Sequence, residues 1–110
     1  QIDTKRRNLI YTLRGVDHMK KVCDQMGSRL VMAPIVFNQH ADLNDSLRNY
    51  ASERKIDFID LKELMLVREN FLPNDLHFSP EGHRNLAELL NNWLKQNPIK
   101  TEEETKPLDL

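Results

Sequence analysis

The chain has 110 residues, of which 39% are apolar and 30% are charged, and its formal net charge is −1. These values fit one small globular domain, and a nearly neutral chain has no field that would steer it as a whole onto nucleic acid or an anionic membrane. Its longest apolar run, Leu30 to Phe37, is far shorter than the roughly 20 residues of a membrane-spanning helix, and its single cysteine, Cys23, excludes an intrachain disulfide framework.

The first predicted helix covers residues 8–26. Its apolar residues recur at intervals of three and four, as on one face of an amphipathic helix, and Gly27 follows as a C-terminal cap. Cys23 lies on this face, which predicts a buried and unreactive thiol. The next segment, residues 29–37 or "RLVMAPIVF", is a short apolar run that Pro34 interrupts. Such a run predicts a strand buried on both faces, which is typical of a parallel sheet covered by helices.

A second helix and a second strand follow. Asp42 is the expected N-cap of a helix that ends near Lys55. The stretch "IDFIDL", residues 56–61, predicts a short buried strand. After it, residues 63–68 are expected to hold one or two helical turns, and residues 69–75 a loop.

The last predicted helix has the clearest end signals of the chain. Ser79, Pro80 and Glu81 supply an N-cap, a first-turn proline and a first-turn acid, and Asn97 with Pro98 ends the helix. Its apolar face is expected to pack inward through Leu86, Leu89, Leu90, Trp93 and Leu94. The remaining segment, 98–110, is charged and without periodicity, which predicts a flexible acidic tail.

This alternation of helices and strands predicts a three-layer α/β/α domain with a parallel sheet and right-handed crossovers. Two short strands cannot cover the apolar faces of three helices, and both would be sheet edges with open hydrogen-bonding groups. We therefore interpret residues 1–97 as the C-terminal part of one doubly wound domain. Its sheet is expected to be completed by the N-terminal half of the same domain or by a second copy, and Gln1 in place of a starting methionine agrees with this interpretation.

The loop between the second strand and the last helix contains Asp75 and His77. In open α/β sheets, sites form in loops beyond the C-terminal ends of the strands. A carboxylate that accepts a hydrogen bond from one imidazole nitrogen fixes the tautomer and leaves the other nitrogen free to take a proton from a serine or a water. The pattern predicts that His77 is a general base, the alternative being a surface histidine that helps a turn.

The other histidines have structural interpretations. His83 is expected to pack or cap in the first turn of the last helix, His18 to lie on a helix surface and His40 in a loop. The set Asp75, His77 and His83 matches no known metal-ligand spacing, so neither a metal nor another cofactor is expected.

Residues 74–94, "NDLHFSPEGHRNLAELLNNWL", closely resemble the C-terminal block of the SGNH hydrolases, also called the GDSL lipase/esterase family. In that block an Asp and a His precede a short polar turn, a Gly and a helix. The resemblance extends less specifically over residues 8–95 and implies a flavodoxin-like α/β/α fold and a serine hydrolase that cleaves esters without a metal. By position, His77 matches the catalytic base and Asp75 the acid that orients it, whereas many members place the acid at the position of Asn74.

The family's nucleophile is missing from this chain. No Gly-Asp-Ser block follows a strand, Ser28 and Ser46 occupy a helix end and a helix, and the oxyanion-hole blocks would lie before Gln1. Two functions therefore stay open. The chain is either a fragment of a serine ester hydrolase that contributes the acid and the base, or a non-catalytic interaction or structural domain that retains the fold. The sequence predicts neither the ester nor the localisation.

Overall fold

The computed structural model of the protein describes residues 4–37 and 40–99, without the side chains of Lys5 and Ala41. Segment 100–110, most of the predicted acidic tail, lies outside the described residues. The described chain is mixed α/β and mostly helical. Its elements are α1 (Thr4–Met26), β1 (Val31–Met32), α2 (Ala41–Glu53), β2 (Asp57–Phe58), α3 (Lys62–Leu66), the 3₁₀ helix η2 (Arg68–Asn70) and α4 (Pro80–Gln96).

The two strands form a small parallel sheet in which residues 31–32 lie opposite residues 57–58. The Ile59 N–H extends the pairing by donating to the Met32 carbonyl oxygen at 2.8 Å. Parallel pairing is thus confirmed, but β1 is shorter than the apolar run that predicted it. The next hydrogen bond of the ladder would need an N–H from residue 34, which proline lacks, so the strand ends at Met32.

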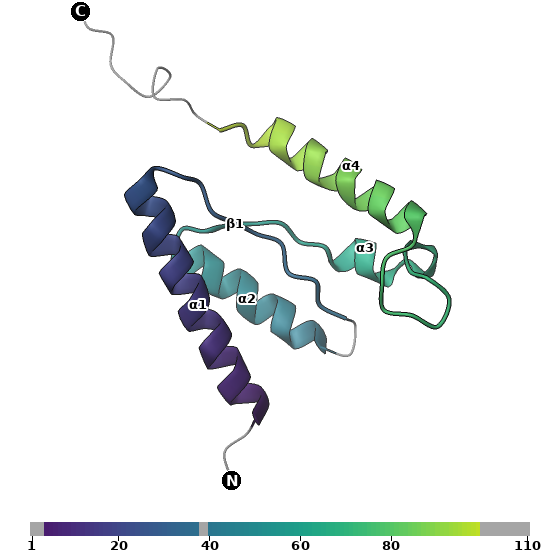
Figure 1. Ribbon diagram of the computed structural model, residues 1–110, viewed down its shortest axis with the longest axis horizontal. Helices are drawn as coiled ribbons and strands as arrows, with labels where there is room; N and C mark the ends of the chain where they lie inside the picture. Colours follow the sequence, from purple (N-terminus) through teal and green to yellow (C-terminus); the bar gives the residue numbers. More distant parts are fainter. Residues whose placement is uncertain (1–3, 38–39, 100–110) are drawn as a thin grey trace, which may run out of the picture.

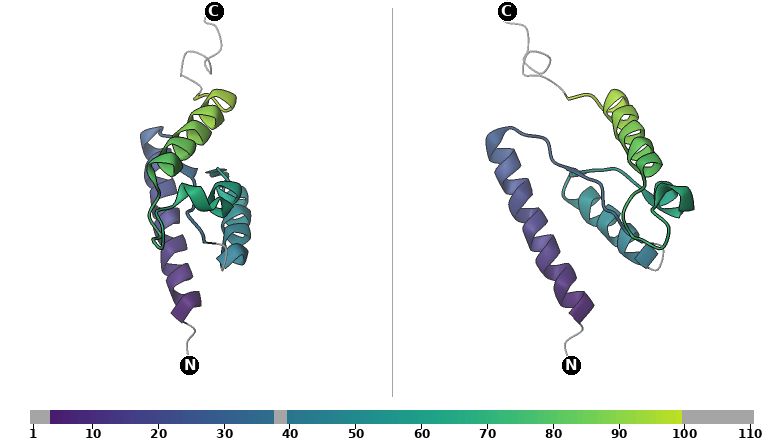
Figure 2. Two further views of the ribbon diagram at one scale, coloured as in Figure 1. Left: turned by 90° about the vertical axis from the view of Figure 1, so that its right-hand side faces the viewer. Right: turned by 45° about the vertical axis from the view of Figure 1, so that its right-hand side comes forward.

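Helices cover both faces of this sheet, with α1 and α2 on one side and α4 on the other (Figures 1 and 2). Because successive side chains of a strand point to opposite faces, Met32 packs toward α1 and α2 whereas Val31 packs toward α4. The buried side chains form two hydrophobic clusters. The first cluster is centred on Val16, Tyr50, Ala51 and Ile56, and the second cluster on Ile59, Leu61 and Met65. The larger flavodoxin-like sheet that the family resemblance implies stays a prediction.

The predicted cap at the end of α1 is confirmed. Gly27 has a φ of 70°, in the left-handed region that favours glycine. The Ser28 N–H donates to the Cys23 carbonyl oxygen at 2.8 Å, and the Gly27 N–H donates to that of Asp24 at 3.4 Å. This pair of hydrogen bonds is the Schellman motif, which satisfies the last carbonyl groups of the helix.

The apolar face of α1 is less covered than its sequence predicts. Val16 is the buried side chain among those described in α1, whereas Met19 and Met26 are 49% and 74% exposed. Cys23 is half-buried. The expectation of a buried thiol at Cys23 is therefore wrong, because helical periodicity identifies an apolar face but not a neighbouring element that covers it.

Polar contacts join α1 to α2. The Tyr50 hydroxyl lies 2.9 Å from the Leu13 carbonyl oxygen and also donates to the Asp17 carboxylate, which accepts from Arg54 Nε at 2.8 Å. The Arg54 guanidinium lies over the Tyr50 ring. Burial and the hydrogen bond to Asp17 raise the pKa of Tyr50 to about 12, because both favour the neutral phenol.

The start of α2 differs from its prediction. Its N-cap is His40, without a side-chain cap hydrogen bond, and Asp42 lies within the first turn. The expected cap at Asp42 is therefore wrong, although a carboxylate in the first turn still interacts favourably with the helix dipole. The helix ends at Glu53, close to the predicted end near Lys55.

The predicted start and end of α4 are confirmed. The Ser79 hydroxyl accepts from the Gly82 N–H at 3.0 Å, a proline follows at the start of the helix, and Asn97 is the C-cap. Most of the predicted apolar face packs on the second cluster through Leu86, Leu89, Leu90 and Trp93. The inward packing expected for Leu94 is wrong, since its side chain is 47% exposed. It follows Trp93 directly and so lies about 100° around the helix from it.

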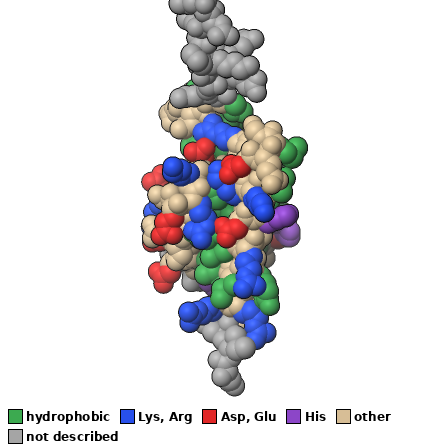
Figure 3. Space-filling view, turned by 90° about the vertical axis from the view of Figure 1, so that its left-hand side faces the viewer, with side chains coloured by type: hydrophobic (Ala, Val, Ile, Leu, Met, Phe, Trp, Pro, Cys, Tyr) green, Lys and Arg blue, Asp and Glu red, His purple; other side chains and the backbone are tan. Residues whose placement is uncertain are grey.

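The surface carries both signs of charge. Figure 3 shows basic and acidic side chains interspersed on the side of the molecule where α1 lies, which agrees with a net charge of −1. Among the described helices, none is both long and apolar enough to cross a membrane.

Candidate acid–base site

The segment between η2 and α4 is a hairpin that projects from the body of the protein. Phe71 and Phe78 form an isolated antiparallel bridge, and their rings stack with centroids 5.2 Å apart. Within the bridge, the Leu72 N–H donates to the His77 carbonyl oxygen at 3.0 Å. The hairpin thus fixes the backbone on both sides of its tip, which contains Asp75.

A tight turn forms the tip of this hairpin. The Asp75 N–H donates to the Leu72 carbonyl oxygen at 3.1 Å, with Pro73 and Asn74 in the two central positions. The φ of Asn74 is 56°. A proline followed by a residue with positive φ is the pattern of a type II turn, and Asn tolerates that conformation better than most residues. The structure therefore accounts for Asn74 by its backbone conformation.

Asp75 and His77 contact each other directly. His77 Nδ1 lies 2.5 Å from Asp75 Oδ1, and the backbone N–H of His77 donates to the same oxygen at 2.9 Å. These hydrogen bonds hold the pKa of the Asp75 carboxyl below its ordinary value. Since an ionised carboxylate only accepts hydrogen bonds, Nδ1 carries the proton in the neutral imidazole.

The other ring nitrogen of His77 is accessible. The His77 side chain is 85% exposed, and among the described residues Nε2 makes no hydrogen bond. With the proton on Nδ1, the lone pair of Nε2 is free to accept a proton from a group brought to it. The geometry is that of an imidazole oriented by a carboxylate, an arrangement that can act as a general base.

Asn70 anchors the hairpin at its base. Its side chain is 2% exposed, donates to the Leu64 carbonyl oxygen at 2.9 Å and accepts from Asn85 at 2.8 Å. Its backbone carbonyl accepts from the Ser79 N–H at 2.9 Å. Gly82 lies so close that a Cβ on it would be 1.9 Å from the same carbonyl oxygen. These contacts bring the two ends of the hairpin together.

Sequence reasoning missed this anchor. A buried asparagine has no characteristic sequence pattern, because its partners lie on separate elements. Gly82 did offer a signal, since an isolated glycine inside a helix lowers stability unless packing requires it.

The other three histidines lie apart from Asp75 and His77. His83 is exposed, and its ring contacts the Phe78 ring edge at 5.6 Å between centroids, so it packs as expected. His18 is exposed on α1, and His40 precedes α2. Within the described residues, no group of three His, Cys, Asp or Glu side chains could hold a metal ion.

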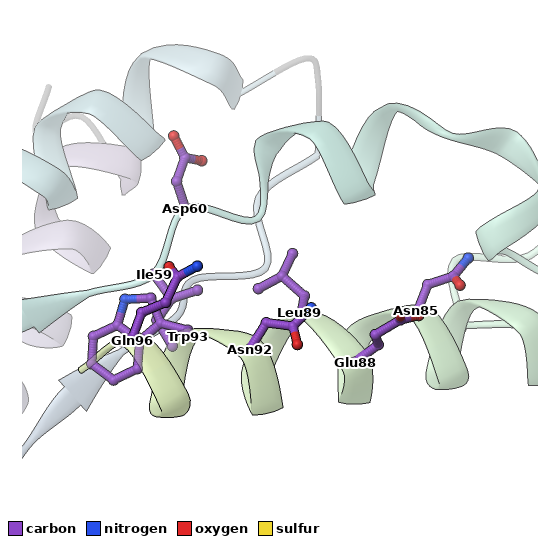
Figure 4. A pocket seen from close by; sticks show the side chains of 8 residues that line it. All are labelled: Ile59, Asp60, Asn85, Glu88, Leu89, Asn92, Trp93 and Gln96. Carbon is purple, nitrogen blue, oxygen red and sulfur yellow. The ribbon is translucent and has the colours of Figure 1, made fainter. Parts of the chain in front are cut away.

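The sequence predicted none of the surface cavities. One, of about 650 Å³, adjoins Asp75 and lies between the hairpin, Met65 and Phe37. A second, of about 460 Å³, lies between α4 and the end of β2 (Figure 4). Asp60 lines this second cavity, but Arg48 and Asn44 already bind its carboxylate. A third, of about 680 Å³, lies between α1 and α2. Of these three, the first lies beside the acid–base pair.

No protein-family model, curated protein or solved structure matches this chain.

Proposed function

We propose that Asp75 and His77 are the acid and the base of an SGNH-type serine ester hydrolase. The nucleophilic serine and the oxyanion hole come from a segment that completes the domain. The observation that carries this proposal is the 2.5 Å contact between His77 Nδ1 and Asp75 Oδ1, with Nε2 open on an exposed hairpin. No metal or other cofactor takes part.

In the proposed reaction, His77 Nε2 accepts the proton of the serine hydroxyl while the serine oxygen attacks the ester carbonyl. The resulting imidazolium then protonates the departing alkoxide, and the same base activates water to release the acid from the enzyme. Asp75 stays ionised throughout and stabilises the imidazolium. Its depressed pKa supports this role, because the carboxylate remains charged at neutral pH.

The open edge of β1 supports the need for a completing segment. Met32 uses its carbonyl group to pair with β2. Alternate residues of a strand direct their backbone groups to opposite edges, so Val31 and Ala33 direct theirs away from β2. Neither residue has a backbone hydrogen-bond partner on that edge among the described residues. An added strand would satisfy these groups, and it could belong to the N-terminal half of the domain or to a second copy.

A non-catalytic interaction or structural domain is the alternative, and the serines favour it. Ser79 donates to the Glu69 carbonyl oxygen and caps α4. Ser46 and Ser52 lie within α2, and Ser28 takes part in the cap of α1. Among the described residues no serine hydroxyl contacts His77, so the two functions differ in whether the completing segment supplies one.

The test uses the complete protein, meaning these residues together with the completing segment. This protein is labelled with a fluorophosphonate. Mass spectrometry should find one modified serine, in a Gly-Asp-Ser block at the end of a strand, and His77→Ala should abolish the modification. His83→Ala is the matched control and should leave it in place. If no serine reacts, or if labelling does not depend on His77, the non-catalytic domain is the better account.

A further inference from the structure

The N-terminal half of α1 is strongly basic. Residues 4–16 contain Lys5, Arg6, Arg7 and Arg14 and no Asp or Glu, although the net charge of the whole chain is −1. Arg6, Arg7 and Arg14 are exposed, and within the described residues none of them forms a salt bridge. Exposed cations without an ion-pair partner create a local positive potential, which favours an acidic partner.

The cavity of about 680 Å³ between α1 and α2 adjoins this basic region. Leu9, Leu43 and Leu47 supply its apolar lining, and Leu47 belongs to the buried core. Arg6 and His40 also line the cavity, whereas no Asp or Glu does. The cavity therefore fits large apolar side chains that are carried by an acidic segment.

Segment 101–110 of this chain has that chemistry. A run of glutamates from Glu102 to Glu104 is followed by Leu108 and Leu110, and the acids of the segment outnumber its single lysine. The segment lies outside the described residues. Its lack of apolar periodicity predicts flexibility, but an extended segment can bind through single side chains that enter a cavity while charges fix its direction.

Segment 101–110 follows α4, whose end lies far from the cavity. Arg29 Nη1 donates to the Asn97 carbonyl oxygen at 2.5 Å, so the end of α4 lies close to the end of α1 (Figure 1). The cavity lies at the other end of α1. Since an α-helix rises about 1.5 Å per residue, Arg14 lies about 20 Å from Gly27 along the helix axis, and Leu9 lies about 27 Å from it.

The extended length of the segment matches these distances. At about 3.3 Å per residue, Glu103 can reach about 20 Å from Asn97, and Leu108 can reach about 36 Å. The glutamates can therefore lie beside Arg14 while the leucines enter the cavity.

We propose that segment 101–110 binds in extended form along α1 of the same chain, with its glutamates beside Arg14 and with Leu108 and Leu110 in the cavity between α1 and α2. Burial of the two leucines supplies most of the binding free energy, because exposed ion pairs contribute little. The charges fix the direction and the register of the segment. This inference does not depend on the proposed ester hydrolysis.

Nuclear Overhauser effects between leucine methyl groups test this placement in the complete protein. The methyl groups of Leu108 and Leu110 should show cross-peaks to those of Leu9, Leu43 or Leu47. The cross-peak between Leu43 and Leu47, one helical turn apart on α2, is the internal control. If the control is present and the others are absent, the proposal is wrong.

The same experiment distinguishes other occupants of the cavity. Cross-peaks that appear only between labelled and unlabelled chains would show that a second copy supplies the segment, and they would overturn binding within one chain. Cross-peaks from the completing segment to Leu9 or Leu47 would show that this segment fills the cavity, which would also overturn the proposal.

Charge reversal tests the register. Arg14→Glu and Glu103→Lys should each lower the Leu108 and Leu110 cross-peaks about threefold, because each variant replaces an attraction by a repulsion. The double variant should restore them. Arg84→Glu is the matched control, since Arg84 is an exposed arginine on α4 outside the cavity, and it should change them by less than twofold. Equal effects of Arg14→Glu and Arg84→Glu, or no recovery in the double variant, would overturn the proposed register.

A leucine variant tests the anchor. Leu108→Asn should lower the Leu110 cross-peaks at least fivefold, because an amide gains little from an apolar cavity. Leu94→Asn, at a half-exposed leucine on α4, should change them by less than twofold. In both variants the Leu43–Leu47 cross-peak should keep its intensity, which shows that α2 stays folded. Equal effects of the two variants would overturn the anchoring of the segment by Leu108.

Discussion

Gly82, in the first turn of α4, lies in direct contact with the backbone of Asn70 in η2. A methyl group on Gly82 would lie 1.9 Å from the Asn70 carbonyl oxygen, 2.7 Å from its carbonyl carbon and 2.9 Å from its Cα. All three atoms belong to the backbone, so no side-chain rotation relieves the clash. The candidate acid–base hairpin is held between these two residues, and its position therefore depends on the absence of a side chain at Gly82.

Gly82→Ala should lower the free energy of unfolding by about 3 kcal/mol, the upper end of the range for overpacking. In an open helix the same change usually stabilises by about 1 kcal/mol. Gly15→Ala is the matched control, because Gly15 lies inside α1 with nothing within 4 Å of the added methyl group. Urea unfolding should therefore give opposite signs for the two variants, and a stabilised Gly82→Ala would show that the contact at Asn70 is not rigid.

The roles of the residues around His77 can be ranked by ester kinetics of the complete protein. His77→Ala should lower turnover of p-nitrophenyl butanoate by several orders of magnitude without unfolding the protein, because an exposed side chain contributes little to stability. Asp75→Asn should lower turnover less than that but more than Asn74→Ala. His83→Ala should lower stability slightly, through its contact with Phe78, and keep turnover. Unchanged turnover in His77→Ala would exclude it as the base.

The Asp75–His77 hydrogen bonds also predict a pH effect. The pKa of Asp75 is lowered, so its contribution to stability is present above the unfolded value, about 3.9, and is lost as the pH falls through the lower folded value. Carbon NMR of the carboxyl group should show this depressed midpoint. In His77→Ala the midpoint should rise, because the side-chain hydrogen bond is the main cause of the shift. An unchanged midpoint would mean that the two side chains do not pair in solution.

Titration of Tyr50 tests the packing of α1 against α2. In a Tyr11→Phe background Tyr50 is the remaining tyrosine, and its absorbance should titrate near pH 12. The folded pKa is above the unfolded value of about 10, so its stabilising contribution is complete below pH 10 and is lost as the pH rises toward 12. Adding Asp17→Asn should move the midpoint only part of the way back, because burial is the larger cause. A midpoint near 10 in both proteins would show that α1 does not pack on Tyr50.

The open edge of β1 can be tested by amide exchange. In the complete protein, an added strand should protect the Val31 and Ala33 amides as strongly as that of Ile59, which donates to Met32 within the sheet. Light scattering should then report a mass above that of this 13.0 kDa chain. A cooperatively unfolding 13 kDa monomer, with protected Ile59 and fast exchange at Val31 and Ala33, would contradict the need for completion.

Features that depend on a few neighbouring residues could be predicted from the amino-acid sequence. Gly27 was predictable as a cap because a C-terminal cap depends only on the backbone conformation at the end of the helix. Ser79 was predictable as the N-cap of α4 because its hydroxyl needs only the N–H groups of the first helical turn. The contact between Asp75 and His77 is similarly local, because a spacing of two residues in a turn lets one carboxylate reach both the ring and the backbone N–H.

Which apolar and polar side chains are buried became apparent only from the packing of the helices and strands. Periodicity placed Met26 and Leu94 on apolar faces, yet both are exposed, because burial depends on whether a neighbouring element covers the face. Asn70 is polar and yet buried, because its polar groups form hydrogen bonds with Leu64, Asn85 and Ser79 on three separate segments. Contacts between such segments depend on how the chain packs, so the spacing of residues along the sequence does not predict them.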